Sequence, residues 1–148
     1  MRYKKGNKSK IQMVCEIVAE LSSTKGKTYG LYNSGFINKD VINANFQKGY
    51  HLIEALKTNR IIYSKGISVQ VKDFAQYIEK NYVCLVTLSN SKYWTYRYEE
   101  NLNGIDNAIV LFCLPENAFK KDGALHTFLG TDTELSTKRI IEYYSKRW

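Results

Sequence analysis

Two histidines and three cysteines are the residues of this sequence that most readily do chemistry, and their spacing argues against a metal or catalytic centre. Cys15, Cys84 and Cys113 are far apart, odd in number and surrounded by apolar neighbours. This pattern predicts buried thiols in a reducing compartment. His51 and His126 are isolated, each within a strand-like segment. We therefore favour a structural role for both histidines over a catalytic or metal-binding one.

Basic and aromatic side chains offer a different chemistry, the binding of a polyanion. The 148 residues carry a net charge of +8, which fits nucleic-acid binding and a solubilising surface equally well. Lys57 and Arg60 follow a strand-like segment, where they would either meet DNA or form a solvated turn. The stretch "KYWTYRYEE" (92–100) alternates aromatic and polar residues. We favour a half-buried strand of a packed core there over a surface that stacks on bases.

The elements that must position these residues begin with alternating helices and strands. Such alternation predicts a parallel α/β arrangement with crossover helices. Apolar residues recur at helical spacing in 9–22, where Ser9 suits the start, and in 37–49, which Gly49 would end. The apolar residues expected to be buried are Ile11, Val14, Ile17, Val18 and Leu21 in the first helix and Val41, Ile42, Ala44 and Phe46 in the second. Strands are predicted at 28–32 and 50–56, a turn at 33–36, a hairpin around 65–66 and a short helix at 71–80.

The second half of the chain consists mainly of strand-like segments. Strand-like runs separated by polar turns fill 82–131 and predict an antiparallel meander. A final helix follows, with Ser136 as its N-cap and Ile140, Ile141 and Tyr144 at helical spacing. The fold class is therefore α/β of the α+β kind. We expect one domain over 1–148, in which an α/β part (9–80) and the start of a last helix (134–148) flank a β-rich insertion (82–131).

Three stretches in this order carry a resemblance that covers essentially the whole chain. They are "LYNSGF" (31–36), "GYHLIEALKTNRIIYSKG" (49–66) and "TFLGTDTELSTKRIIEYYSKRW" (127–148). The sequence resembles the DDE transposases of bacterial insertion sequences, in the group with a β-rich insertion and a Tyr-Arg-Glu-Lys signature. The resemblance implies a partial ribonuclease H-like domain. In the intact family, two Asp and one Glu hold two Mg²⁺ ions that drive attack on a phosphodiester.

The catalytic carboxylates that the family requires do not map onto this sequence. Asn33 stands at the position of the second Asp, and a neutral amide brings no charge to a cation. The first Asp would lie upstream of Met1, and the Glu would fall at position 151, past Trp148. Asp132 matches a strand end rather than a catalytic position. We expect a truncated remnant that has lost its catalytic activity and binds no Mg²⁺.

The residues implied in DNA binding are better preserved. Tyr144 and Arg147 match the Tyr and Arg of the signature, which contact the phosphate backbone of transposon ends in the family. An arginine suits this role because its planar fork can bind a phosphate through two hydrogen bonds. The alternative for both residues is a helix face packed on the sheet.

The resemblance implies a role in DNA transposition, with the DNA of transposon ends as the partner. A non-catalytic DNA-binding protein that pairs with an intact transposase and inhibits it is the alternative, and a basic nuclease-like domain with unknown ligands is a third. We expect the strands at 28–32 and 50–56 to lack partners at their edges. This predicts low stability unless the chain docks on another copy or on an intact transposase. No apolar run reaches the length of a membrane span, so a cytoplasmic protein is predicted.

Overall fold

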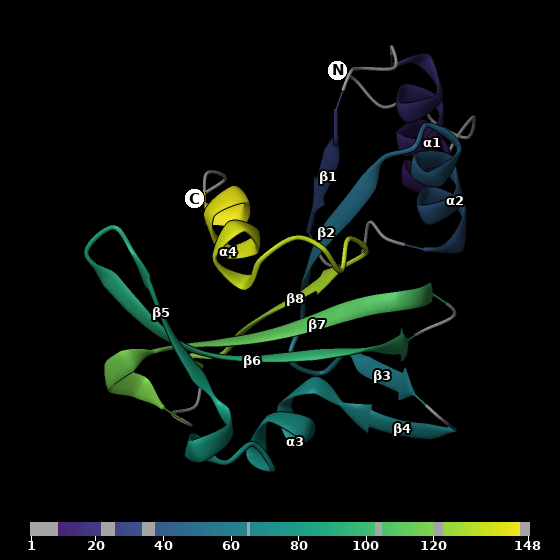
Figure 1. Ribbon diagram of the computed structural model, residues 1–148. Coiled ribbons are helices and arrows are strands. Elements are labelled where there is room, and N and C mark those ends of the chain that lie inside the picture. Colours follow the sequence, from purple (N-terminus) through teal and green to yellow (C-terminus); the bar gives the residue numbers. More distant parts are fainter. Residues whose placement is uncertain are drawn as a thin grey trace.

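The computed structural model has an α+β fold and describes residues 9–21, 26–33, 38–64, 66–102, 105–119 and 123–145 (Figure 1). Its helices are α1 (Lys10–Glu20), α2 (Lys39–Gln47), α3 (Val71–Gln76) and α4 (Thr137–Ser145), with short 3-10 turns η1 (Lys80–Tyr82) and η2 (Glu116–Ala118). Its strands are β1 (Tyr29–Tyr32), β2 (His51–Leu56), β3 (Ile61–Ser64), β4 (Ile67–Gln70), β5 (Cys84–Leu88), β6 (Ser91–Leu102), β7 (Ile105–Pro115) and β8 (His126–Gly130). The predicted order of elements is confirmed, although α3 is shorter than expected.

Six strands form one sheet in the order β1-β2-β8-β7-β6-β5, and β3 and β4 form a separate hairpin. The predicted parallel pairing of β1 with β2 is confirmed, as is the antiparallel meander from β5 to β8. The expectation that both early strands lack partners is wrong for β2. Strand β8 pairs with it in antiparallel fashion and carries the sheet on into the β-rich half of the chain. Of these two early strands, only β1 lies at a sheet edge.

Local signals explain where the first two helices begin and end. Ser9 and Gln12 form a capping box at the start of α1, which satisfies two otherwise free amides. The Asn38 side chain accepts from the Val41 amide at 3.0 Å and caps α2 in the same way. Helix α2 ends before Gly49, whose φ of +72° favours glycine. The predicted turn at 33–36 lies outside the described residues except for Asn33.

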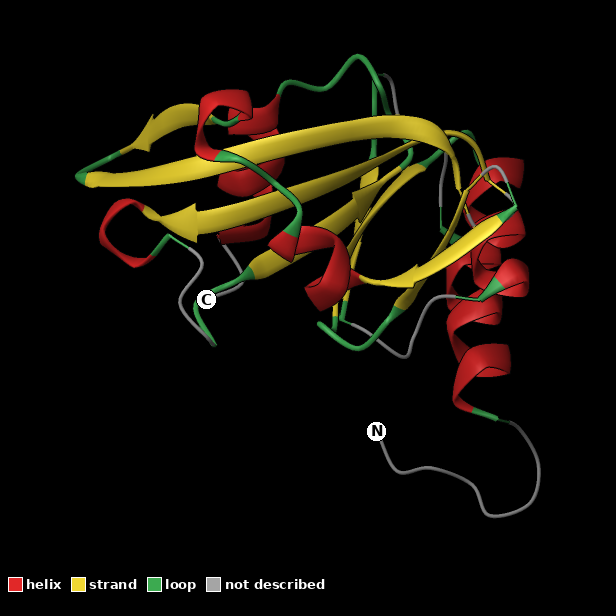
Figure 2. Cartoon of the chain, turned by 90° about the horizontal axis from the view of Figure 1, so that it is seen from below, coloured by secondary structure: helices red, strands yellow, loops and turns green. Residues whose placement is uncertain are grey.

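Helices cover both faces of the sheet (Figures 1 and 2). Helix α4 lies on one face, where Ile140 and Ile141 pack against Ile109 and Phe128. On the other face, α1 and α2 cover the β1–β2 end through a small core around Val41. Helix α3 and the β3–β4 hairpin cover the remainder of that face. The sheet is therefore the middle layer that connects the α/β part to the β-rich part.

The aromatic strand β6 belongs to the core, as favoured from its pattern. Phe74 of α3 lies 5.4 Å from Tyr98, 6.2 Å from Tyr96 and 5.1 Å from Phe112, measured between ring centroids. Trp94 packs edge-on against a neighbouring ring and donates to the Glu116 carbonyl. These rings are engaged with one another rather than arranged as an open stacking surface.

Several residues expected to be buried are exposed. Ile17 of α1, Leu21 just after that helix and Phe46 of α2 are about half exposed, because α1 packs on α2 and only one side of the pair reaches the sheet. The thiol-bearing Cys84 is also exposed, since it lies on the edge strand β5. Of the three predicted buried cysteines, only Cys113 is fully buried. Burial raises the pKa of the Cys113 thiol.

Candidate functional site

Helix α4 brings together the first and the last of the three stretches that carry the resemblance. Asn33 directly follows β1, and the Tyr144 hydroxyl lies 2.8 Å from its side-chain oxygen. The same hydroxyl lies 3.0 Å from the Tyr32 carbonyl oxygen. Ser136 caps the start of the helix as predicted, accepting from the Arg139 amide at 3.2 Å. The contact joins residues 111 positions apart and places the last helix directly beside the end of β1.

Tyr144 itself is buried, with 3% of its surface exposed. Its ring packs 5.0 Å from that of Phe128. Tyr144 thus lies on a helix face packed on the sheet, the alternative to the predicted DNA contact, and the DNA contact itself stays a prediction. Arg147, the second signature residue, lies outside the described residues.

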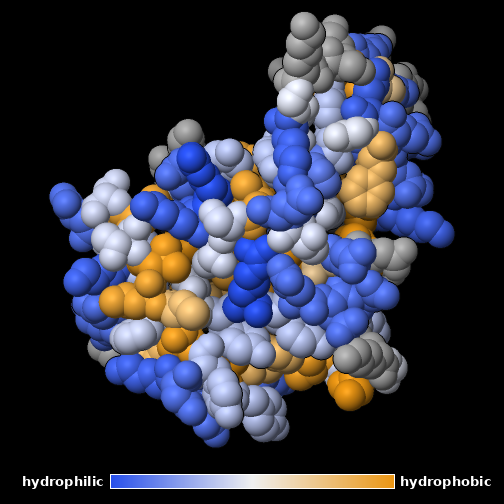
Figure 3. Space-filling view, viewed as in Figure 1, coloured by the Kyte–Doolittle hydropathy of each residue, from blue (hydrophilic) through white to orange (hydrophobic). Residues whose placement is uncertain are grey.

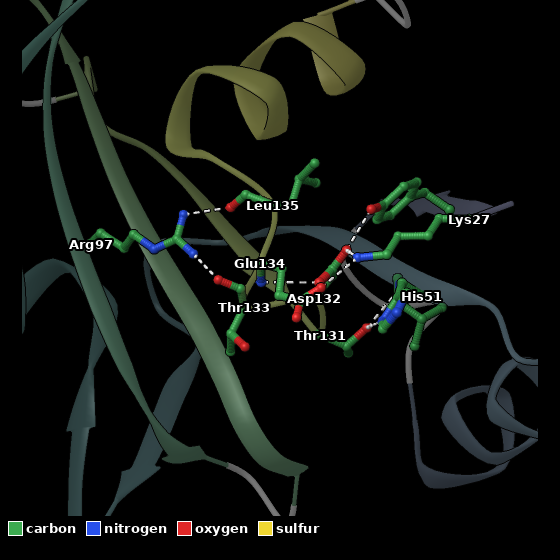
Figure 4. Close-up of polar contacts among 10 residues, drawn as sticks. Lys27, His51, Arg97, Thr131, Asp132, Thr133, Glu134 and Leu135 are labelled. Carbon is green, nitrogen blue, oxygen red and sulfur yellow. Dashed lines mark hydrogen bonds and ion pairs between the residues drawn. The ribbon is translucent and has the colours of Figure 1, made fainter.

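Asp132 lies at the other end of β1, in the loop 131–136 between β8 and α4. Its side chain accepts hydrogen bonds from the Tyr29 hydroxyl, the Lys27 ammonium group at 3.1 Å and the Glu134 amide at 3.0 Å (Figure 4). Burial alone would raise the pKa of Asp132, but these donors outweigh it and hold the pKa below its usual value. The carboxylate ties the start of β1 to the loop before α4. This role agrees with its predicted place at a strand end.

The two histidines lie in different surroundings. His51 begins β2, stacks on the Tyr29 ring at 5.7 Å and lies 3.3 Å from the Thr131 hydroxyl. Thr131 accepts in turn from the Leu52 amide at 3.0 Å. His126 is the first residue of β8 and is exposed, whereas Thr131 follows the last residue of that strand. The two rings therefore do not share a site.

Arg97 of β6 holds the same loop from the opposite side (Figure 4). Its guanidinium donates to the carbonyl oxygens of Thr133 and Leu135, each at 2.7 Å. Glu99 pairs with the same group at 2.8 Å. The β-rich half of the chain thereby fixes the entry to α4, the helix that carries Tyr144.

Replacing Arg97 by methionine should lower the free energy of unfolding by about 2 kcal/mol, because two carbonyl oxygens in a half-buried loop lose a charged donor. Urea denaturation followed by circular dichroism measures the change. The matched control is Arg139→Met, which removes an exposed ion pair with Glu142 on α4 and should cost well under about 1 kcal/mol. Equal losses in the two variants would contradict a special role for Arg97.

A second buried carboxylate, Glu54, lies in the middle of β2 with 1% of its side chain exposed. Arg60 pairs with one of its oxygens at 3.2 Å, whereas Oε1 has no hydrogen-bond partner. The hydroxyl of Thr127, on the neighbouring strand β8, is also buried and unpartnered. Burial raises the pKa of Glu54 to about 7, against the opposing effect of Arg60.

The predicted DNA-binding residues after β2 have different surroundings. Lys57 is exposed in the turn before β3. Arg60 turns back onto Glu54 and keeps 30% of its side chain exposed. The two residues thus lie on one turn, where Lys57 is exposed and Arg60 is paired with a buried carboxylate.

Neither Asn33, which the resemblance maps to a catalytic position, nor Asp132, which it maps to a strand end, fits a Mg²⁺ site. Magnesium prefers charged oxygen ligands, whereas the Asn33 oxygen is neutral and already accepts from Tyr144. The Asp132 oxygens face an ammonium group, a hydroxyl and an amide, all of them donors. Within the described ranges, no three His, Cys, Asp or Glu side chains are grouped as metal ligands.

The residues that hold Asp132 and the loop 131–136 were not singled out from the sequence, and Arg60, the partner of Glu54, was considered only for DNA binding. Lys27 and Tyr29 are distant from Asp132 along the chain, as Arg97 is from the loop carbonyls it binds, and nothing in their local pattern indicates a contact. Glu54 carried a signal that could have been used, a carboxylate at the centre of the apolar segment "YHLIEAL" (50–56). Such a residue needs a cation nearby. Lys57 and Arg60 both follow it in the sequence, and in the structure Arg60 is the one that pairs with it.

A scan against models of known protein families gives no match, and a search of curated proteins finds none of similar sequence. Among the residues that the structure describes, no helix is both long and apolar enough to cross a membrane.

Proposed function

We propose that this chain is a transposase-derived protein of DNA transposition that binds DNA without cutting it. The contact between Asn33 and Tyr144 carries the proposal. In the DDE transposases that the sequence resembles, the end of a strand and the last helix contribute to a single site. The hydrogen bond between the corresponding residues here supports the same pairing of elements.

The order of elements gives further support. The parallel unit β1-α2-β2 is followed by an antiparallel β-rich block, and α4 then returns to the first strand. This is the arrangement that the resemblance implies. The neutral Asn33 supports the loss of metal-dependent cutting, because an amide cannot replace the charge of a carboxylate ligand.

The charge distribution supports binding through basic segments of the chain. The chain contains 22 basic and 14 acidic residues, a net charge of +8. Residues 1–8 alone hold four lysines and arginines. A positive excess of this kind favours phosphate contacts that release counterions.

The test is fluorescence anisotropy with a labelled random-sequence duplex of about 40 base pairs at several salt concentrations. The affinity should fall by about a thousandfold between roughly 50 and 200 mM salt. Lys57→Ala should lower the salt dependence by about one counterion. Lys92→Ala, the same change at an exposed position in β6, should leave it unchanged.

Two results would overturn the proposal. One is the absence of DNA binding at low salt. The other is Mg²⁺-dependent nicking of a supercoiled plasmid that disappears in Asp132→Asn, because the chain would then be an active nuclease with Asp132 as a ligand.

A further inference from the structure

Strand β5 forms the outer edge of the six-stranded sheet (Figure 1), and its Val86 and Leu88 pack toward the face that α4 covers. It pairs with β6 on one side only. The main-chain groups on its other side have no partner among the described residues. An open strand edge with no charge, proline or bulge invites pairing with another strand, and the sequence of β5, Cys-Leu-Val-Thr-Leu, contains none of these protective features.

The hydrogen-bond pattern shows which groups face outward. The Cys84 carbonyl points to β6, where it accepts from the Thr95 hydroxyl at 3.0 Å. Main-chain groups alternate in direction along an antiparallel strand, so Val86 and Leu88 also bond to β6. The amide and carbonyl groups of Leu85 and Thr87 therefore point to the open edge.

We propose that β5 pairs with β5 of a second copy of this chain to form a symmetric dimer with a continuous sheet. Leu85 and Thr87 flank Val86 symmetrically. A two-fold axis at Val86 places Leu85 opposite Thr87 of the second copy and the reverse, which forms four main-chain hydrogen bonds. A two-fold dimer requires a self-complementary surface of this kind.

The side chains around the axis suit this pairing. The strand has no charged residue, so no like charges meet across the axis. Leu85 is 41% exposed, and Tyr82 just before the strand is 66% exposed. Figure 3 shows apolar side chains gathered at the side of the molecule where β5 lies. The contact is short, so the dimer should dissociate on dilution.

Sedimentation analysis of the full chain over a range of concentrations tests the proposal. We expect a doubling of the mass at high concentration. Thr87→Pro removes an outward amide, which edge strands tolerate, and should weaken the dimer by about tenfold or more. Leu85→Lys should do the same through charge repulsion. Thr87→Val, which keeps the amide, should not.

Crosslinking tests the position of the axis. In a Cys84→Ser background, Val86→Cys places two thiols opposite each other at a non-hydrogen-bonded pair, where mild oxidation should link two chains. Thr87→Cys in the same background faces Leu85 and should link far less.

Three results would overturn the dimer: a monomer at all concentrations, a dimer unaffected by both Thr87→Pro and Leu85→Lys, or equal crosslinking at positions 86 and 87. A monomer that crosslinks only with an unrelated peptide strand would assign the edge to a different partner. None of these outcomes depends on DNA binding, so the dimer and the proposed function can fail separately.

Discussion

Glu54→Gln should stabilise the protein above neutral pH and have little effect near pH 5. The pKa of the buried Glu54 is about 7 in the folded protein, against an ordinary value of 4.5. The folded state therefore binds a proton that the unfolded state has released. As the pH rises from about 4.5 through 7, the wild-type protein loses up to about 3 kcal/mol through this group. Glutamine is neutral throughout and avoids this loss.

Urea denaturation of both proteins at several pH values between about 5 and 8 measures the effect. The difference in unfolding free energy between variant and wild type should grow across this window and level off above it. Glu79→Gln, which removes an exposed glutamate, should give a difference that does not change with pH in this way. A constant difference for Glu54→Gln would mean that the buried carboxylate remains charged at all these pH values, held by Arg60.

The positions of the helices and strands could be predicted from the sequence, whereas the pairing of β2 within the sheet could not. The caps at Ser9 and Ser136 and the end at Gly49 act over a few residues, and periodic apolar residues mark the strands directly. The pairing of β2 with β8 joins segments more than 70 residues apart. No local pattern encodes that choice, so β2 was wrongly expected to lack a partner.

In the candidate site, too, local features could be predicted from the sequence and long-range contacts could not. Asn33 and Tyr144 could be placed on a strand end and a helix from local sequence, and the structure brings them together. The exposure of Ile17 and Phe46 could not be anticipated, because helical periodicity identifies an apolar face but not what covers it. The contacts of Asp132 with Lys27 and of Arg97 with the loop 131–136 arise only from the packing of the sheet against α4.

Asp132→Asn should lower the free energy of unfolding by about 2 to 3 kcal/mol at neutral pH. All three partners of this carboxylate, Lys27, Tyr29 and the Glu134 amide, are donors. An amide of the same shape has only one acceptor oxygen. In either orientation it must therefore place its own N–H groups against a donor in a site where 5% of the side chain is exposed.

Glu134→Gln is the matched control, because Glu134 binds the same lysine at 3.0 Å but is 82% exposed. It should cost less than about 1 kcal/mol. The pKa of Asp132 lies below its ordinary value of 3.8, so its stabilising contribution is present above that pH and is lost as the pH falls further. The difference between wild type and Asp132→Asn should shrink in acid. If Asp132→Asn instead left stability unchanged at neutral pH, the three donors would not hold the loop, and this carboxylate would again be open to a role as a ligand.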